Sequence, residues 1–171
     1  LMPGGDLATQ FPERMLYGIL PTEEIRSLLQ SRGWSEGSLK ILSQMVERKF
    51  NSPVTTSTGR VLDAAAALLG ICREHTYDGE PSMTLEAYAS RGVSQPMDIS
   101  IHTSADGAYV LSTSALLLEA YSMMEDGLDT CDIAASVQEN LAKGIARLAV
   151  LSAEKTGIRK AALSGGVAIN R

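Results

Sequence analysis

The chain has 171 residues, a formal net charge of −5 at pH 7, and 44% hydrophobic and 20% charged residues. This composition supports a buried core and excludes a disordered chain, and the acidic balance argues against a nucleic-acid partner. The longest uncharged apolar stretch, residues 64–72, is too short to cross a bilayer, and no leader segment opens the chain. With two cysteines and two histidines, no disulfide framework is indicated. We therefore expect a cytoplasmic chain with no membrane partner.

The first part of the sequence predicts three helices. Residues 1–6 contain a Pro-Gly-Gly breaker and read as a loop that continues from an upstream segment. Apolar residues recur at helical spacing over 7–20, which predicts one helix. Thr22 is placed as the N-cap of a second helix that runs to about residue 30, and Ser35 as the cap of a third.

The segment TTSTGRVLDAAAALLGI, residues 55–71, gives the strongest helical signal in the chain. Serines and threonines that can cap a helix precede an apolar stripe at helical spacing. This stripe comprises Val61, Leu62, Ala65, Leu68 and Leu69. A short helix over residues 82–89 is predicted after the turn YDGEP.

The second part of the sequence changes its period. In residues 98–112, two β-compatible runs flank Asp106-Gly107, which predicts a hairpin because glycine supplies the positive φ of the turn. Helices are predicted over 114–124 and 133–155. Residues 158–171 indicate a short buried strand, a Gly-Gly turn and the start of a helix.

The Gly165-Gly166 pair is a candidate anion site. Backbone approaches a phosphate closely only where no side chain intervenes, and a helix N-terminus offers unpaired N–H groups to an anion. A plain strand-to-helix turn has the same sequence, and neither a P-loop lysine nor a GxGxxG spacing accompanies the glycines. The two interpretations remain open on this motif alone.

Two carboxylates are candidates for a ribose contact. Asp63 lies on the face of its helix away from Leu62, so it is either solvent-exposed with a weak ion pair to Arg60, or an acceptor for ribose hydroxyls at the rim of a cleft. Glu80, between Gly79 and a proline, allows the same two interpretations, since such turns also occur without any function.

Other reactive side chains give weaker signals. Cys72 and His75 are one helical turn apart but lack a second pair of ligands, so no metal site is predicted. His102 alternates with an apolar residue in a hairpin strand and is expected to face solvent. No GxSxG elbow and no cysteine beside a base are present, so nucleophilic catalysis has no support.

Three separated segments together resemble the C-terminal domain of the HypF carbamoyltransferase family, which is similar to the tRNA-modifying transferase TsaD. They are PGGDLATQFPERM, the block TTSTGRVLDAAAALLGI with YDGEPSMTLEA, and LSGGVAINR. The resemblance covers nearly the whole chain. TsaD typically has a Gly-Gly-Pro turn where this chain has Gly79-Glu80-Pro81, which favours the HypF family.

The resemblance implies a fold and a chemistry. The expected fold class is α/β and predominantly helical, one lobe of an actin, sugar kinase and heat-shock (ASKHA) type fold with a short β-hairpin and a short buried C-terminal strand. Family members use ATP and carbamoyl phosphate, pass through carbamoyl adenylate and carbamoylate the C-terminal cysteine of HypE, as a step toward the cyanide ligand of [NiFe]-hydrogenase. The nucleotide-binding positions that match are Asp63, Glu80, Gly165, Gly166 and Asn170.

The chain is expected to be a fragment. The resemblance implies that residues 1–171 form one lobe as a single domain fragment, that the metal-binding histidines precede it and that a later acidic ligand follows it. The divalent metal expected of the full domain therefore has no ligands here, and we expect the isolated chain to be inactive. The alternatives are a protein-interaction module that docks HypE without nucleotide, with a homodimer through exposed apolar surface, or a TsaD-like tRNA transferase.

Overall fold

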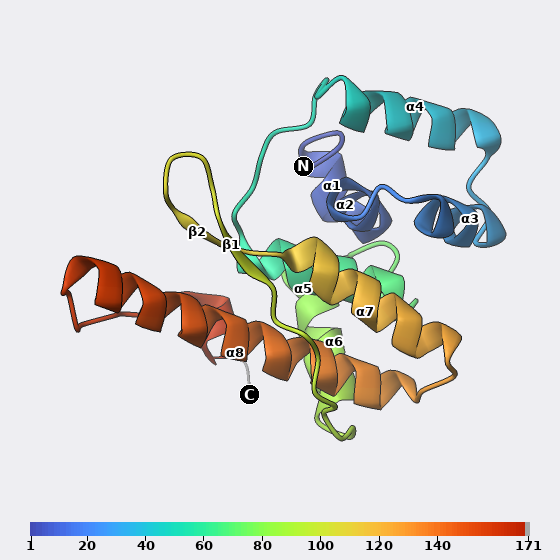
Figure 1. Ribbon diagram of the computed structural model, residues 1–171. Helices are drawn as coiled ribbons and strands as arrows, with labels where there is room; N and C mark the ends of the chain where they lie inside the picture. Colours follow the sequence, from blue (N-terminus) through green and yellow to red (C-terminus); the bar gives the residue numbers. More distant parts are fainter. Residues whose placement is uncertain (170–171) are drawn as a thin grey trace. The chain divides into compact units, whose positions relative to one another are not determined.

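A computed structural model describes residues 1–169 and divides the chain into two compact units, Leu1–Leu85 and the residues from Glu86 onward (Figure 1). The described part is mainly helical, with one two-stranded sheet. None of its helices combines the length and the apolar character that a membrane span needs. The first unit contains α1 (Asp6–Gln10), α2 (Pro12–Ile19), α3 (Glu23–Ser31), α4 (Glu36–Glu47), α5 (Thr58–Leu68) and the start of α6 (Glu80–Ala89).

The core of the first unit forms between α2 and α5. Met15 and Leu16 of α2 are fully buried, and every residue of α5 from Val61 to Leu68 is buried. The run Ala64–Ala67 carries only methyl side chains, so neighbouring elements can approach this helix on all sides. The predicted helix is confirmed, and its burial extends beyond the predicted stripe to the whole circumference.

The single helix expected over residues 7–20 is in fact two helices. The chain leaves the helical region at Phe11, with φ −115° and ψ 89°, and α2 begins at Pro12. A proline disfavours the helical conformation of the preceding residue and lacks the N–H that would continue the helix. The prediction was therefore wrong at Phe11 for a reason visible in the sequence.

The predicted caps of α3 and α4 are confirmed. The Thr22 hydroxyl accepts a hydrogen bond from the Ile25 backbone N–H, and the Ser35 hydroxyl accepts one from Ser38. Each bond satisfies an N–H group that the first turn of a helix otherwise leaves free.

The second unit is built on a long helix. It contains β1 (Ile101–Thr103), β2 (Tyr109–Leu111), α7 (Thr113–Glu125), α8 (Thr130–Thr156) and η1 (Gly166–Ile169). The predicted hairpin is confirmed: β1 and β2 pair antiparallel with His102 opposite Val110, and Gly107 has φ +85°. His102 is exposed, as predicted. Both α7 and β2 pack on α8.

An extended segment, residues 93–97, is hydrogen-bonded along α8. Side chains four residues apart on the helix accept hydrogen bonds from backbone N–H groups two residues apart on the segment. Asp132 accepts from Val93 at 2.7 Å, Ser136 from Gln95 at 2.8 Å and Asn140 from Met97 at 3.2 Å. Two extended residues advance about 6.6 Å and four helical residues about 6.0 Å, so the two repeats stay in register. Just before this ladder, the backbone at Gly92 contacts the backbone of Cys131.

The end of the chain differs from the expected strand. Helix α8 ends at Gly157, which has φ +75° as a left-handed cap, in agreement with the prediction. Residues 158–164 are exposed and form no strand. A strand requires a neighbouring strand to pair its backbone groups, and the one sheet among the described residues is the β1–β2 hairpin.

Candidate functional site

Asp63 is buried, with an exposed fraction of 1%. Its Oδ2 lies 3.0 Å from Nη1 of Arg60, one turn earlier on α5, and its Oδ1 accepts a hydrogen bond from the Ser82 hydroxyl of α6 at 2.9 Å. The predicted ion pair is therefore present, but the interpretation of Asp63 as a solvent-exposed residue is wrong. The burial of α5 therefore includes the face that carries Asp63, where Ser82 of α6 lies against the carboxylate.

The environment of Asp63 favours its protonated form. Burial raises the pKa of Asp63, and Arg60, Ser82 and His75 oppose this shift without cancelling it. The ion pair is poorly directed, because neither Oδ2 nor Nη1 of Arg60 makes a hydrogen bond of good geometry. A buried charge whose partner is imperfectly placed is not fully compensated for the water it has lost.

The Asp63→Asn substitution tests this interpretation through the pH dependence of stability. A raised folded pKa gives stability that is present below the unfolded value, 3.8, and is lost as pH rises through the folded pKa. We therefore expect the variant to gain stability relative to the wild type between acidic and neutral pH, measured by urea unfolding across that range. Glu80→Gln provides the contrast, with the opposite sign. A relative stability of Asp63→Asn that falls with pH would contradict the assignment.

Glu80 is the first residue of α6 and is held by the preceding turn. Its Oε2 accepts hydrogen bonds from the backbone N–H of Thr76 and from the Thr76 hydroxyl, the latter at 3.0 Å. The backbone bond from Thr76 is the main cause that lowers the pKa of Glu80. Gly79, with φ +83°, permits the turn. The structure thus fixes a half-exposed, ionised carboxylate at the N-terminus of α6, where a negative charge is favourable.

Asp63 and Glu80 belong to one local electrostatic cluster within the first unit. Burial is the main cause that raises the pKa of the Cys72 thiol, and the negative charges of Glu80 and Asp63 raise it further. Cys72 is buried and free, and its thiol donates to the Glu74 carbonyl at 3.5 Å. Among residues 1–169, no three side chains of the histidine, cysteine and acidic types are grouped as metal ligands.

The paired glycines lie in the second unit. Gly165 has φ +93° and Gly166 begins η1, and no heavy atom lies within 4 Å of a Cβ built on either residue. The backbone here is therefore open to an approaching group. Asn170 lies outside the described residues. The predicted contacts of these residues with a nucleotide stay predictions.

Sequence reasoning missed a charged cluster around Glu13 of α2. This buried carboxylate accepts hydrogen bonds from Trp34 Nε1 at 2.6 Å and from Arg73 Nε at 2.8 Å, and Arg32 lies 3.8 Å away. Arg32 also donates to the carbonyls of Ala67 and Leu68, so it satisfies the C-terminal end of α5. The four side chains come from three separate segments, namely α2, the connection between α3 and α4, and the loop after α5, so no local pattern could have indicated the cluster.

Comparison with known proteins identifies the class of protein. A family described as "Carbamoyltransferase, Kae1-like Domain, second subdomain" matches residues 1–171. This helical chain with one hairpin is therefore a subdomain of a Kae1-like carbamoyltransferase domain. More particularly, the chain belongs to the HypF carbamoyltransferase family.

The two relatives described next are each several times longer than this chain. The chain is 40% identical over 172 residues to a probable carbamoyltransferase HypF of Methanocaldococcus jannaschii, covering 98% of this chain and 22% of the relative. It is 30% identical to HypF of Rhizobium leguminosarum bv. viciae, covering 99% of this chain and 22% of the relative. The chain thus spans about a fifth of these proteins.

Two solved structures share the fold. A full-length HypF in its phosphate- and nucleotide-bound form superposes with a TM-score of 0.85 at 26% identity, covering 99% of this chain and 22% of that one. HypF of T. kodakarensis superposes with a TM-score of 0.78 at 32% identity, covering 99% and 23%. The predicted resemblance and fold class are confirmed, apart from the C-terminal strand.

Proposed function

We propose that this chain is one part of a full-length HypF-type carbamoyltransferase that uses ATP and carbamoyl phosphate, forms carbamoyl adenylate and transfers the carbamoyl group to the C-terminal cysteine of HypE during [NiFe]-hydrogenase maturation. The observation that carries the proposal is the match of the family over all of residues 1–171. A relative whose structure holds phosphate and nucleotide supports nucleotide use. The metal of the complete domain would be held by residues outside this chain.

Within this chain, we assign nucleotide contacts to Asp63, Glu80, Gly165, Gly166 and Asn170. Support for Glu80 is its ordered, half-exposed carboxylate, and support for the glycines is the open space beside them. For Asp63 the assignment entails a rearrangement, because Arg60 and Ser82 now contact its two oxygens. Ribose hydroxyls would reach this carboxylate after one of those contacts is broken.

The Gly166→Ala substitution tests the glycine assignment in the full-length protein. The added Cβ meets no atom of the described chain, so the fold should tolerate it, while a phosphate that contacts the backbone would be displaced. We expect ATP to bind at least tenfold more weakly, equivalent to about 1.4 kcal/mol, and carbamoyl transfer to HypE to fall in parallel. Isothermal titration and labelled carbamoyl transfer measure the two effects.

The control for this test is Gly37→Ala, which makes the same chemical change in the first turn of α4, where the nearest atom lies 3.9 Å from the new Cβ. It should bind ATP like the wild type. Unchanged ATP affinity in a folded Gly166→Ala protein would remove the glycine pair from the nucleotide site. The isolated chain, which lacks most of the enzyme, should show no carbamoyl transfer.

The proposed partner and location follow from the same family. HypE is the expected protein partner, and exposed apolar side chains such as Phe50 and Val54 offer surface for docking or for self-association of the chain. Both cysteines are free, which fits a reducing cytoplasm. A tRNA substrate is disfavoured by the net charge of −5.

A further inference from the structure

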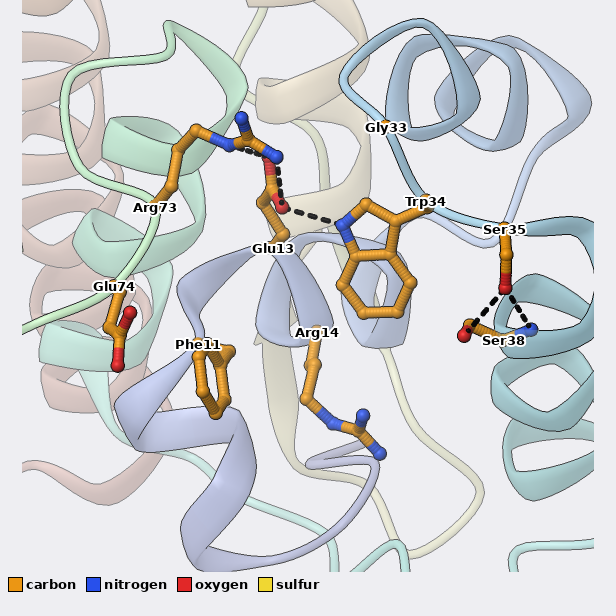
Figure 2. Close-up of a pocket in the computed structure, with 9 residues that line it drawn as sticks. All are labelled: Phe11, Glu13, Arg14, Gly33, Trp34, Ser35, Ser38, Arg73 and Glu74. Atoms are coloured by element: carbon orange, nitrogen blue, oxygen red, sulfur yellow. Dashed lines mark hydrogen bonds and ion pairs between the residues drawn. The ribbon is translucent and has the colours of Figure 1, made fainter.

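An open pocket of about 700 Å³ lies in the first unit (Figure 2). Its size is within the range of small-molecule sites. It contains none of the residues assigned above to the nucleotide. The lining residues come from the start of α2, the connection between α3 and α4, the start of α4 and the loop after α5, and they include Phe11, Glu13, Arg14, Trp34 and Arg73.

Two aromatic rings form part of the pocket wall. Phe11 and Trp34 are both only partly buried. The chain has one tryptophan and two phenylalanines, so this pocket holds the one indole and half of the phenyl rings. The Trp34 indole projects from the segment Gly33–Ser35 toward α2, and the Phe11 ring lies on the other side of Arg14 in the view of Figure 2. A pocket that concentrates scarce aromatic surface is suited to a ligand with a flat apolar part.

The Glu13 cluster holds this wall in place. The carboxylate bonds to Trp34 Nε1 at 2.6 Å and orients the indole, and its bond to Arg73 Nε at 2.8 Å orients that guanidinium. Arg73 also donates to the Arg32 carbonyl at 2.8 Å. With its conformation fixed before binding, the site loses little entropy when a ligand enters.

Arg14 supplies a half-buried positive charge without an acidic partner. Its Nε donates to the Pro3 carbonyl at 2.8 Å and its Nη2 contacts the sulfur of Met45 at 3.6 Å. No carboxylate among the described residues forms an ion pair with it within 4.0 Å. Burial lowers the pKa of Arg14. A cation that has lost water without gaining an anion attracts an anionic ligand.

The other charges of the pocket do not cancel this attraction. Glu13 already faces two guanidinium groups, those of Arg32 and Arg73. Glu74 lies at the exposed edge and accepts a hydrogen bond from Gln10 at 3.3 Å. Solvent screens this exposed carboxylate more strongly than the half-buried Arg14.

We propose that this pocket binds a small organic anion, namely an aromatic ring that bears a phosphate or a carboxylate. The ring packs against the aromatic wall that Phe11 and Trp34 contribute, and the anionic group pairs with Arg14. The site is independent of the proposed carbamoyl transfer, since it shares no residue with the assigned nucleotide contacts.

Trp34 fluorescence tests the proposal in the chain as it stands, because this residue is the chain's one tryptophan. Four probes separate the contributions: phenyl phosphate, benzyl alcohol, inorganic phosphate and AMP. We expect phenyl phosphate to change the emission saturably below millimolar concentration, with benzyl alcohol and inorganic phosphate at least tenfold weaker. AMP binding as strong as that of phenyl phosphate would indicate that the ligand of the pocket is a nucleotide, and weaker AMP binding would indicate another aromatic anion.

The Arg14→Met variant removes the charge and retains an unbranched stem. We expect phenyl phosphate to bind it at least tenfold more weakly, while Arg48→Met, the same change at an exposed arginine, leaves binding unaltered. Should Arg14→Met fail to fold, Phe11→Leu takes its place. This variant should weaken the binding of phenyl phosphate without affecting the binding of inorganic phosphate. No emission change with phenyl phosphate at millimolar concentration, or equal binding by the wild type and the variant, would overturn the proposal.

Discussion

The Glu13→Ala substitution is expected to destabilise the first unit by about 3–5 kcal/mol, the usual effect of removing one partner from a buried ion pair. The variant leaves the indole N–H of Trp34 and Nε of Arg73 without their acceptor, and it removes the negative charge that faces the guanidinium of Arg32. Urea unfolding followed by Trp34 emission measures the loss, because that indole lies within the affected unit.

Glu47→Ala provides the control for this prediction. Glu47 is also an acidic residue on a helix, but it is exposed and accepts a hydrogen bond from the hydroxyl of Ser43, one turn earlier. Its removal should change the free energy of unfolding by less than about 0.5 kcal/mol. A loss below about 1 kcal/mol for Glu13→Ala would mean that the cluster around Glu13 contributes no more than an exposed pair.

The Gly92→Ala substitution should destabilise the second unit by about 3 kcal/mol. A Cβ at this position would lie 2.0 Å from the carbonyl oxygen of Cys131 and 2.6 Å from the backbone nitrogen of Asp132. Both contacts are with backbone at the start of α8, so no side-chain rotation can relieve them. Thermal unfolding monitored by circular dichroism gives the measurement.

The matched control for Gly92→Ala is Gly37→Ala, where the same methyl group makes only an ordinary contact with Ser35 at 3.9 Å on a helix and should be neutral or slightly stabilising. A thermal midpoint for Gly92→Ala within one degree of the wild type would show that the contact between residue 92 and α8 is loose in solution.

Local features of the fold could be predicted from the sequence. Thr22 and Ser35 cap their helices as expected, Gly107 makes the hairpin turn and Gly157 ends α8. Each of these depends on hydrogen bonds or φ values within a few residues. The missed break at Phe11 belongs to this group too, because Pro12 alone was sufficient to indicate it.

Features that depend on distant parts of the chain could not be predicted in the same way. Nothing in the sequence near Asp63 shows that this carboxylate is buried or that Ser82, 19 residues later, bonds to it. The strand expected near Leu163 failed because apolar composition does not supply a pairing partner. Of the candidate site, the carboxylate of Glu80 in its turn was predictable, whereas the Glu13 cluster arises from tertiary contacts.

The hydrogen bonds between residues 93–97 and α8 fix the number of residues in this extended segment. Since each pair of residues in the extended segment matches one helical turn of acceptors, deletion or insertion of a single residue between Val93 and Met97 would put the remaining donors out of phase with Asn140. Length variation between homologues should therefore be absent from this segment and tolerated at the exposed hairpin tip around Ala105.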